Sequence, residues 1–406
     1  MTSETEVWPQ TELHNLVEVL DKERIPVNSS ERSKRIGDIP YYGATGQVGT
    51  IDKAIFDEEL LILGEDGVQF FDPYKPKAYR ISGPSWVNNH AHVLRPIRDK
   101  VNFHFLLHYL NHFNYAGFAN GTTRLKLTQG AMNQIPVPIP PLPEQHKIVE
   151  ILEDHLSRQD AALADVKQAK VKAAQFRRSL LQAAFTGNLG SDGTRLMTAL
   201  PANWNTKTVG ELADTQLGKM LNKGKQSGKF AKPYLRTDNV HWGKFDLSEI
   251  KEMDILPEEE EKYLARNGDL LMCEGGASGR TAIWNQNYNI SFQNHVHRIR
   301  PKDVKEITPK YLLYYFEWFI KNGFANDLIK GVTISSLSQS GLRSIDVAYP
   351  PLPEQHKIVE ILEDHLSRLD ASIALADAME KQSAGLRRSL LQAAFTGQLT
   401  KEVASV

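Results

Sequence analysis

The chain contains the segment PPLPEQHKIVEILEDHLSR twice, at 140–158 and at 350–368. A second segment, RRSLLQAAFTG, is also duplicated, at 177–187 and at 387–397. Both pairs are 210 residues apart, so the stretch between the two segments has kept its length although its residues have diverged. A fixed length with drifting composition predicts a spacer whose reach matters. Such a long internal repeat decides the architecture before any local pattern does.

The duplication extends upstream of these segments, but there the distance between the copies is smaller. The distance rises from 196 residues near the start of each copy to 210 at its end, so we expect the second copy to carry insertions. Most of them fall between the tryptophan and the Asn-His-x-His element. The matching pairs are Trp8 with Trp204, Asn89–His92 with Asn294–His297, Leu106–Tyr109 with Leu312–Tyr315, and Gly121–Gln129 with Gly331–Gln339.

Each copy ends in a segment that predicts a long helix. Residues 144–186 contain no Gly or Pro, and 43 helical residues would span roughly 60 Å. Pro143 and Pro353 suit a first helical turn, and Gly187 and Gly397 suit a C-terminal stop. Gly385 should weaken the second helix locally. Apolar residues recur at heptad spacing, interrupted by Gln159, which predicts a narrow coiled-coil seam.

Two such helices in one chain are expected to bury their seams against each other. A pseudo-two-fold axis between the copies would make them antiparallel. The alternative is that each helix packs only on its own globular domain. We therefore predict an α+β chain with two mixed α/β globular domains, separated by two long antiparallel coiled-coil helices. Within the domains we expect strands at 60–63 and 270–273, and helices near 103–113 and 311–319.

Composition narrows the class of protein. The chain has 406 residues, a single cysteine and no apolar run long enough to cross a membrane, so we expect a cytoplasmic protein without disulfides. The net charge of −1 does not by itself suggest nucleic acid. Residues 1–139 carry 14 basic and 16 acidic residues, whereas 195–349 carry 21 and 18. Any DNA-facing surface must then be a local basic patch.

The duplicated segments, along nearly the whole chain, resemble type I restriction–modification specificity subunits. Residues 40–46, 233–240 and 268–280 also look like that family. The resemblance implies two target-recognition domains, at 1–139 and 195–349, and two conserved spacer helices, at 140–190 and 350–400. It also implies assembly with two methyltransferase subunits and two motor-nuclease (restriction) subunits. S-adenosylmethionine and ATP with Mg²⁺ are then expected on those partners, and this chain is expected to have no cofactor and no catalytic residue.

Two heads on a rigid spacer suit double-stranded DNA, because major-groove faces recur every helical turn of roughly 34 Å. Unlike heads predict an asymmetric target with a gap between its halves. Base contacts need polar or basic side chains at groove depth, and lysines and arginines position them on phosphates. The residues expected at DNA are Lys34, Arg35, Tyr41, Tyr42, Thr45, Gln47, Thr122, Thr123, Arg124 and Lys126 in the first head, and Lys219, Lys223, Lys225, Lys229, Lys232, Arg236, Asn239, Ser278 and Arg280 in the second.

Several motifs that suggest other chemistry are set aside. The His-x-His pairs at 90–92 and 295–297 have no third metal ligand in reach of the pattern, so we expect structural strands there. Residues 218–225 approach a P-loop, but the spacing is wrong and Gln226 stands where Ser or Thr is required. Arg177 and Arg387, each followed by a second arginine, fit DNA contact, helix-end packing or a partner interface.

One rival function belongs to another class. A coiled-coil scaffold that joins proteins and never contacts DNA would also have two heads and paired helices. The glycine-rich loops and the lysine cluster at 219–232 argue against it. So do heads that differ most in their loops.

Overall fold

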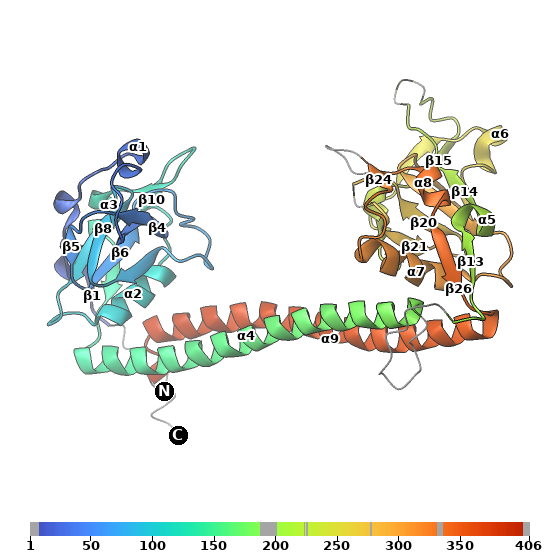
Figure 1. Ribbon diagram of the computed structural model, residues 1–406. Helices are drawn as coiled ribbons and strands as arrows, with labels where there is room; N and C mark the ends of the chain where they lie inside the picture. Colours follow the sequence, from blue (N-terminus) through green and yellow to red (C-terminus); the bar gives the residue numbers. More distant parts are fainter. Residues whose placement is uncertain are drawn as a thin grey trace, which may run out of the picture. The chain divides into compact units, whose positions relative to one another are not determined.

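The computed structural model describes residues 8–186, 201–222, 224, 226–276, 278–330 and 336–400. The chain forms two compact units: residues 1–167 with 376–406 are unit 1, and residues 168–375 are unit 2 (Figure 1). Each unit contains one globular head, which we call head 1 (residues 8–141) and head 2 (residues 201–351). None of the helices in the described residues combines the length and the apolar character needed to cross a bilayer.

Head 1 is built on two four-stranded sheets. The first is antiparallel, in the order β2-β9-β6-β7, and the second has the order β4-β3-β8-β5, with β3 and β8 parallel. Two short pairs, β1-β12 and β10-β11, complete the head. The elements are β1 (Gln10–Glu12), η1 (Leu13–Asn15), β2 (Val17–Val19), η2 (Asp21–Glu23), α1 (Ser29–Arg32), β3 (Ile39–Gly43), β4 (Gly46–Ile51), β5 (Phe56–Asp57), β6 (Leu60–Gly64), β7 (Ala78–Ile81), β8 (Pro84–Val87), β9 (Ala91–Pro96), α2 (Phe103–His112), β10 (Ala119–Asn120), β11 (Lys126–Leu127), α3 (Gln129–Asn133) and β12 (Pro136–Pro138).

Head 2 repeats this plan. Its sheets have the orders β14-β23-β20-β21 and β18-β15-β22-β19, again with one parallel pair, β15 with β22. The pairs β13-β26, β16-β17 and β24-β25 are added. The elements are β13 (Asn205–Thr208), α5 (Val209–Leu212), β14 (Ala213–Leu217), β15 (Ala231–Leu235), η4 (Thr237–Asn239), β16 (Val240–His241), β17 (Lys244–Phe245), β18 (Lys251–Asp254), α6 (Pro257–Glu260), β19 (Leu264–Ala265), β20 (Leu270–Cys273), β21 (Thr281–Ile283), β22 (Ile290–Phe292), β23 (Val296–Pro301), α7 (Pro309–Lys321), β24 (Ile329–Lys330), β25 (Ser336–Leu337), α8 (Gln339–Arg343) and β26 (Asp346–Tyr349).

The heads differ in two connections. In head 1 the strands β3 and β4 are joined by two residues, 44–45, whereas residues 236–250 join β15 to β18 and include η4, β16 and β17. Conversely, residues 65–77 form a long β6–β7 loop in head 1, where head 2 has only 274–280. The expected insertions of the second copy are therefore confirmed, and head 1 has an elaboration of its own.

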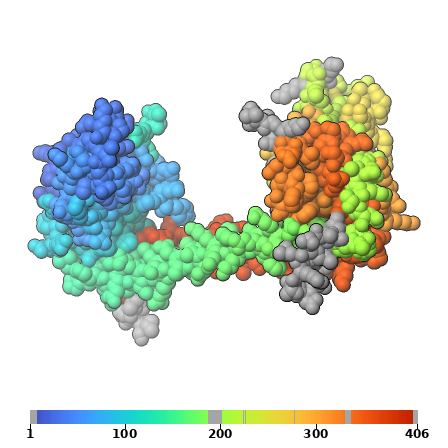
Figure 2. All heavy atoms as spheres, viewed as in Figure 1, coloured from blue at the N-terminus to red at the C-terminus, as the bar shows by residue number. Residues whose placement is uncertain are grey.

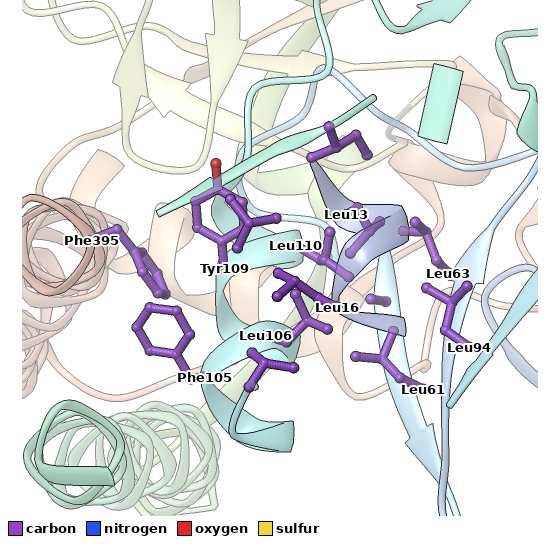
Figure 3. Close-up of a cluster of buried hydrophobic side chains, with 14 of the residues drawn as sticks. Leu13, Leu16, Leu61, Leu63, Leu94, Phe105, Leu106, Tyr109, Leu110 and Phe395 are labelled. Carbon is purple, nitrogen blue, oxygen red and sulfur yellow. The ribbon is translucent and has the colours of Figure 1, made fainter. Parts of the chain in front are cut away.

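Continuous apolar sequence explains the central strands. All five residues of β6 and all four of β20 are buried, as expected of short apolar runs bounded by turns. Both predicted strands and both predicted helices of the heads are thus confirmed. Helix α2 lies on the β2-β9-β6-β7 sheet, and its Phe105 and Tyr109 also meet Phe395 of the last helix edge-on, at ring distances of 5.3 and 5.2 Å (Figure 3). In unit 2 Phe185 packs against α7 in the same way.

The long helices are α4 (Leu142–Phe185) and α9 (Leu352–Phe395). They run antiparallel, because a residue with a higher number on α4 contacts a residue with a lower number on α9. In unit 1 Gln159 donates to the carbonyl of Ser383, and in unit 2 the ring of Phe176 meets that of His365. The predicted coiled coil is confirmed, and the alternative of helices that pack only on their own domains is wrong. Figure 2 shows the first part of α4 lying along head 1 of the same unit.

The expected helix ends agree with the structure where it describes them. Pro143 lies in the first turn of α4, and Gly397 follows α9 with φ of +75°, in the left-handed region that favours glycine. Gly187 lies outside the described residues. Gly385 does not interrupt α9, so packing against α4 outweighs its weak helix propensity.

Candidate nucleic-acid interface

In head 1 four loops meet at the end of β3. We call them loop cluster 1: residues 43–47, 64–67, 88–90 and 120–126. The backbone amide of Asn88 donates to Tyr42, and Asp66 forms an isolated β-bridge with Lys126. A Cβ on Gly64 would lie 3.1 Å from the carbonyl oxygen of Ala44, so the 43–47 turn and the 64–67 loop are in close contact.

The predicted residues of loop cluster 1 are largely accessible. Thr45 and Gln47 are exposed on the β3–β4 turn, and Thr122 and Thr123 are exposed on the β10–β11 loop. Tyr42 is half-buried, with its ring 6.0 Å from that of Tyr79. The structure therefore brings together two stretches of predicted polar side chains that are about 75 residues apart in sequence.

The cations of loop cluster 1 are paired with partly buried carboxylates. Arg124 lies 2.6 Å from Asp66, and Lys126 lies 2.9 Å from Glu65, which also binds Arg24. Burial alone would raise the pKa of Glu65, but hydrogen bonds from Lys126 and Arg24 outweigh burial and lower that pKa. Because both outer cations keep more than half of their side-chain surface exposed, they remain available to an external phosphate.

Head 2 has an equivalent loop cluster 2: residues 235–237, 274–276, 278–280, 293–295 and 336. The amide of Gln293 donates to Leu235, and Gly275 bridges to Ser336, as Asn88 and Asp66 do in head 1. The pattern of backbone contacts is thus repeated in the second copy, although the side chains differ.

Arg280 and Arg236 are the cations of loop cluster 2. Arg280 donates to the carbonyl of Thr237 at 2.9 Å, and Arg236 pairs with Asp238 at 3.1 Å. The Nε atoms of both arginines are buried without a hydrogen-bond partner among the described residues. Ser278 is half-buried, and its hydroxyl donates to the carbonyl of Glu274. Two arginines therefore lie at one point of the head, and both contact the η4 segment, Arg280 through Thr237 and Arg236 through Asp238.

Two predicted DNA contacts are interior residues instead. Tyr41 is 1% exposed, packs in a small core with Ile51 and Trp86, and lies under the guanidinium of Arg32. The side chain of Asn239 is 3% exposed, and its amide closes the 236–250 connection. Neither side chain is presented to a duplex, so for these two residues the prediction is wrong. The residue types of Tyr41 and Asn239 and their local sequence could not show whether these side chains lie in the core or on the surface.

Other predicted cations lie at the opposite end of β3 and β15, away from the loop clusters. Arg35 pairs with Asp52 at 2.7 Å and stacks over Trp86, whereas Lys34 is exposed and makes no ion pair with a described residue. Lys229 is exposed beside Phe230. Lys223 and Lys225 lie outside the described residues.

Helix α6 neutralises part of the predicted lysine group. Lys219 binds Glu259, and Lys232 lies 3.3 Å from Glu260. Ion pairing with Lys219 lowers the pKa of Glu259. The backbone of Lys219 also contacts loop cluster 2, because it forms an isolated β-bridge with Gln293. The lysine group is therefore less basic than its sequence suggested.

The His-x-His pairs have two distinct roles. The second histidine of each pair is buried and binds a carbonyl through Nε2: His92 that of Leu127 and His297 that of Leu337, both at 2.8 Å. The first histidine, His90 or His295, lies on a loop cluster beside a carboxylate. The described residues contain no cluster of three or more His, Cys, Asp or Glu side chains suited to a metal ion. Sequence reasoning missed His90 and His295 as candidate interface residues, although their duplication was visible.

Burial of His297 should make unit 2 sensitive to acid. The pKa of this imidazole is lowered because burial disfavours its charged form. Its contribution to stability is then complete above a pH of roughly 6.5, the ordinary value, and is lost as the pH falls below it. We expect the melting temperature to drop between pH 7 and pH 5, and to drop less in His297→Gln. Calorimetry measures the melting temperature of both proteins. An equal drop in the two would assign the acid sensitivity to groups other than His297.

A family model for the type I restriction modification DNA specificity domain matches residues 5–172 and again 201–375. The chain belongs to the family of type I restriction enzyme specificity subunits. Each match covers a head and the beginning of its long helix, so the family unit is the repeated unit of the fold. The resemblance seen in the duplicated segments is thereby confirmed.

Known specificity subunits align with most of this chain. It is 30% identical over 362 residues to the putative type I restriction enzyme specificity subunit S.HindORF215P of Haemophilus influenzae, which covers 89% of this chain and 87% of the relative. It is 27% identical to the EcoBI specificity subunit of Escherichia coli, over 79% of this chain and 71% of that subunit.

Solved structures share the fold. A chain from work on complex assembly and conformational transition of the type I R-M system superposes with a TM-score of 0.73 at 18% identity, covering 97% of this chain and 99% of the other. The HsdS subunit from Thermoanaerobacter tengcongensis superposes with a TM-score of 0.56, also at 18% identity, covering 97% of this chain and 98% of the other.

Proposed function

We propose that this specificity subunit reads an asymmetric DNA target in two halves, one with each head. The observation that carries the proposal is the repetition of the loop cluster: the same four-way meeting of loops occurs in both heads, built on matching backbone contacts but with different side chains. One scaffold with two unlike reading surfaces is what a two-part, non-palindromic target requires.

Within each head the candidate residues divide by role. Thr45, Gln47 and the threonines of the β10–β11 loop suit base edges in head 1, and Arg236 and Arg280 suit guanine in head 2, because bidentate arginine–guanine pairs are the commonest specific contact. Paired but exposed cations such as Arg124 suit phosphates, where they fix register and carry no sequence information.

The chain supplies no catalytic group in this proposal. Two methyltransferase subunits and two motor-nuclease subunits dock on it, and they bind S-adenosylmethionine and ATP with Mg²⁺. Each head holds an adenine of its half-site near a methyltransferase, which turns the base out of the duplex for methylation. The coiled coil offers most of its outward helix surface to these partners.

A salt titration separates this function from a scaffold that never contacts DNA. With the methyltransferase partner present, specific duplex binding should weaken steeply as salt rises, because bound phosphates release counterions. A complex that retains no duplex at low salt would favour the scaffold.

Replacing Lys223, Lys225 and Lys229 with alanine should weaken binding to every DNA sequence alike. Three lost phosphate contacts would reduce the slope of log affinity against log salt by about 3. Fluorescence anisotropy with a cognate and a scrambled duplex measures both effects. Lys305→Ala, which changes an exposed lysine of the same head outside the predicted site, is the control. An unchanged slope in the triple variant would remove these lysines from the phosphate contacts.

A further inference from the structure

Unit 1 contains a cleft of about 1,410 Å³ between head 1 and the two long helices. One wall is the 65–77 loop with α2, and the other is formed by the 156–163 part of α4 and the 380–395 part of α9. The volume exceeds the roughly 300–1,000 Å³ of small-molecule sites, so a segment of a macromolecule is the natural occupant.

The repeat provides an internal comparison for this cleft. In unit 2 the equivalent position is filled by Trp318, which packs 5.6 Å from Phe185 and 5.0 Å from Phe324 and donates to Gln182. His112 stands at that position in head 1. The 65–77 wall has no counterpart of its length in head 2. The head side of the cleft is therefore made by residues that differ between the copies, whereas much of its helix side is shared.

The lining combines an aliphatic floor with a basic rim. Leu156, Leu163 and Leu391 contribute to the floor, and Lys75 and Arg388 are exposed cations of the rim. Among the described residues that line the cleft, basic side chains outnumber acidic ones. The acidic residue is Glu380, and the basic residues are Lys75, Lys77, Arg80, Arg387 and Arg388. Charge complementarity thus selects an acidic occupant.

Two aromatic side chains stand on the wall formed by the 65–77 loop. Phe71 is 56% and Tyr74 63% exposed, and both line the cleft. Exposed aromatic side chains are typical anchors at protein interfaces. The leucine floor beneath them suits aliphatic side chains of a peptide better than stacked bases.

Two polar residues of the coiled coil, Gln159 and Ser383, also line the cleft, and each has a buried side-chain oxygen without a hydrogen-bond partner among the described residues. The equivalent positions of unit 2 are Leu369 and Ala173, which need no partner. The coiled coil is therefore more polar beside the cleft of unit 1 than at the same positions of unit 2.

We propose that the cleft binds an acidic amphipathic helix from a subunit of the complex, and binds it once per complex because the long 65–77 wall, which carries Phe71, Tyr74 and Lys75, is a feature of head 1. Its apolar face meets the leucine floor, and its carboxylates meet Lys75 and Arg388. The proposal rests on the proposed function only in taking the helix from an assembly partner. It gives a subunit built from two copies of one unit a means to bind one copy of a partner differently from the other.

Photo-crosslinking in the assembled complex tests the proposal. With Phe71→p-benzoylphenylalanine, irradiation should join the chain to one acidic segment of a partner subunit, identified by mass spectrometry. The control is the same photoreactive residue at Tyr288, which is 48% exposed in head 2. Adducts to DNA, or a yield no higher than at Tyr288, would overturn the proposal.

Charge reversal tests the single occupancy. Lys75→Glu with Arg388→Glu should weaken partner binding at least tenfold, as measured by titration of the labelled subunit. Arg178→Glu, at the unit 2 position equivalent to Arg388, and Lys53→Glu, outside the cleft, should leave the affinity within twofold. An equal loss from Arg178→Glu would show a symmetric docking surface instead. Methylome sequencing of the unaltered system distinguishes failures: a host without a two-part methylated motif contradicts the proposed function, whatever the cleft binds.

Discussion

Exchange of residues 195–349 for the second head of another specificity subunit should replace one half of the methylated target and leave the other half unchanged. The reason is that loop cluster 2, with Arg236 and Arg280, lies wholly within head 2 and makes its contacts there. Each wrong base pair costs roughly 1–3 kcal/mol, so three changed base pairs are enough to abolish methylation of the old half-site.

Single-molecule methylation sequencing of the host measures this outcome directly. The matched control is the reciprocal exchange of residues 1–139, which should alter the other half only. The gap between the halves should stay constant in both exchanges, because α4 and α9 are retained. If either exchange altered both halves, the heads would not be independent readers, and the proposed function would fail in its modular form.

The architecture was predictable because it depends on long-range regularity. Heptad spacing and the absence of Gly and Pro from residues 144–186 predicted α4 almost to the residue, and the 210-residue repeat then predicted α9. Short apolar runs such as Leu270–Cys273 predicted buried strands. The sheet orders were not predictable, because the pairing of β3 with β8 joins residues about 45 apart and no local pattern encodes it.

The candidate site was less predictable because side-chain partners are set by the fold. Lys219 looked like a free cation, but its carboxylate partner, Glu259, lies 40 residues later on α6. Asn239 looked like a base reader, but its amide satisfies backbone groups of a connection that is absent from head 1. Polar residue types beside glycines therefore located loops that the fold brings together, whereas tertiary contacts decide which side chains in those loops remain available.

Arg177→Met should lower the free energy of unfolding of unit 2 by about 3 kcal/mol, because it leaves a buried carboxylate without its main partner. Glu317 has a side chain only 4% exposed, and Arg177 binds both of its oxygens, at 2.7 and 3.2 Å. Lys321 also contacts Glu317, at 2.6 Å, which keeps the expected loss at the lower end for broken buried pairs. The measurement is chemical denaturation combined with hydrogen exchange of α7.

The repeat supplies the control. Arg387 is the equivalent residue of unit 1, and its partner Asp160 is mostly exposed, so Arg387→Met should cost less than about 1 kcal/mol. In head 1 the position of Glu317 is occupied by Asn111, whose amide binds backbone groups of residues 77 and 78. Equal losses from the two methionine variants would show that the arginines act through helix packing alone.

Acid should reduce the difference between wild type and Arg177→Met. Burial by itself raises the pKa of Glu317, but hydrogen bonds from Arg177 and the charge of Lys321 outweigh burial and lower that pKa. The wild-type contribution is therefore present above the ordinary pKa of about 4.5 and is lost as the pH falls through the lowered value. In Arg177→Met burial dominates, the carboxyl takes up a proton at higher pH, and the penalty of the buried charge disappears.

The double variant Arg177→Met with Glu317→Leu should recover most of the lost stability at pH 7, because it removes the buried charge altogether. A double variant as unstable as Arg177→Met would locate the loss in packing against α7.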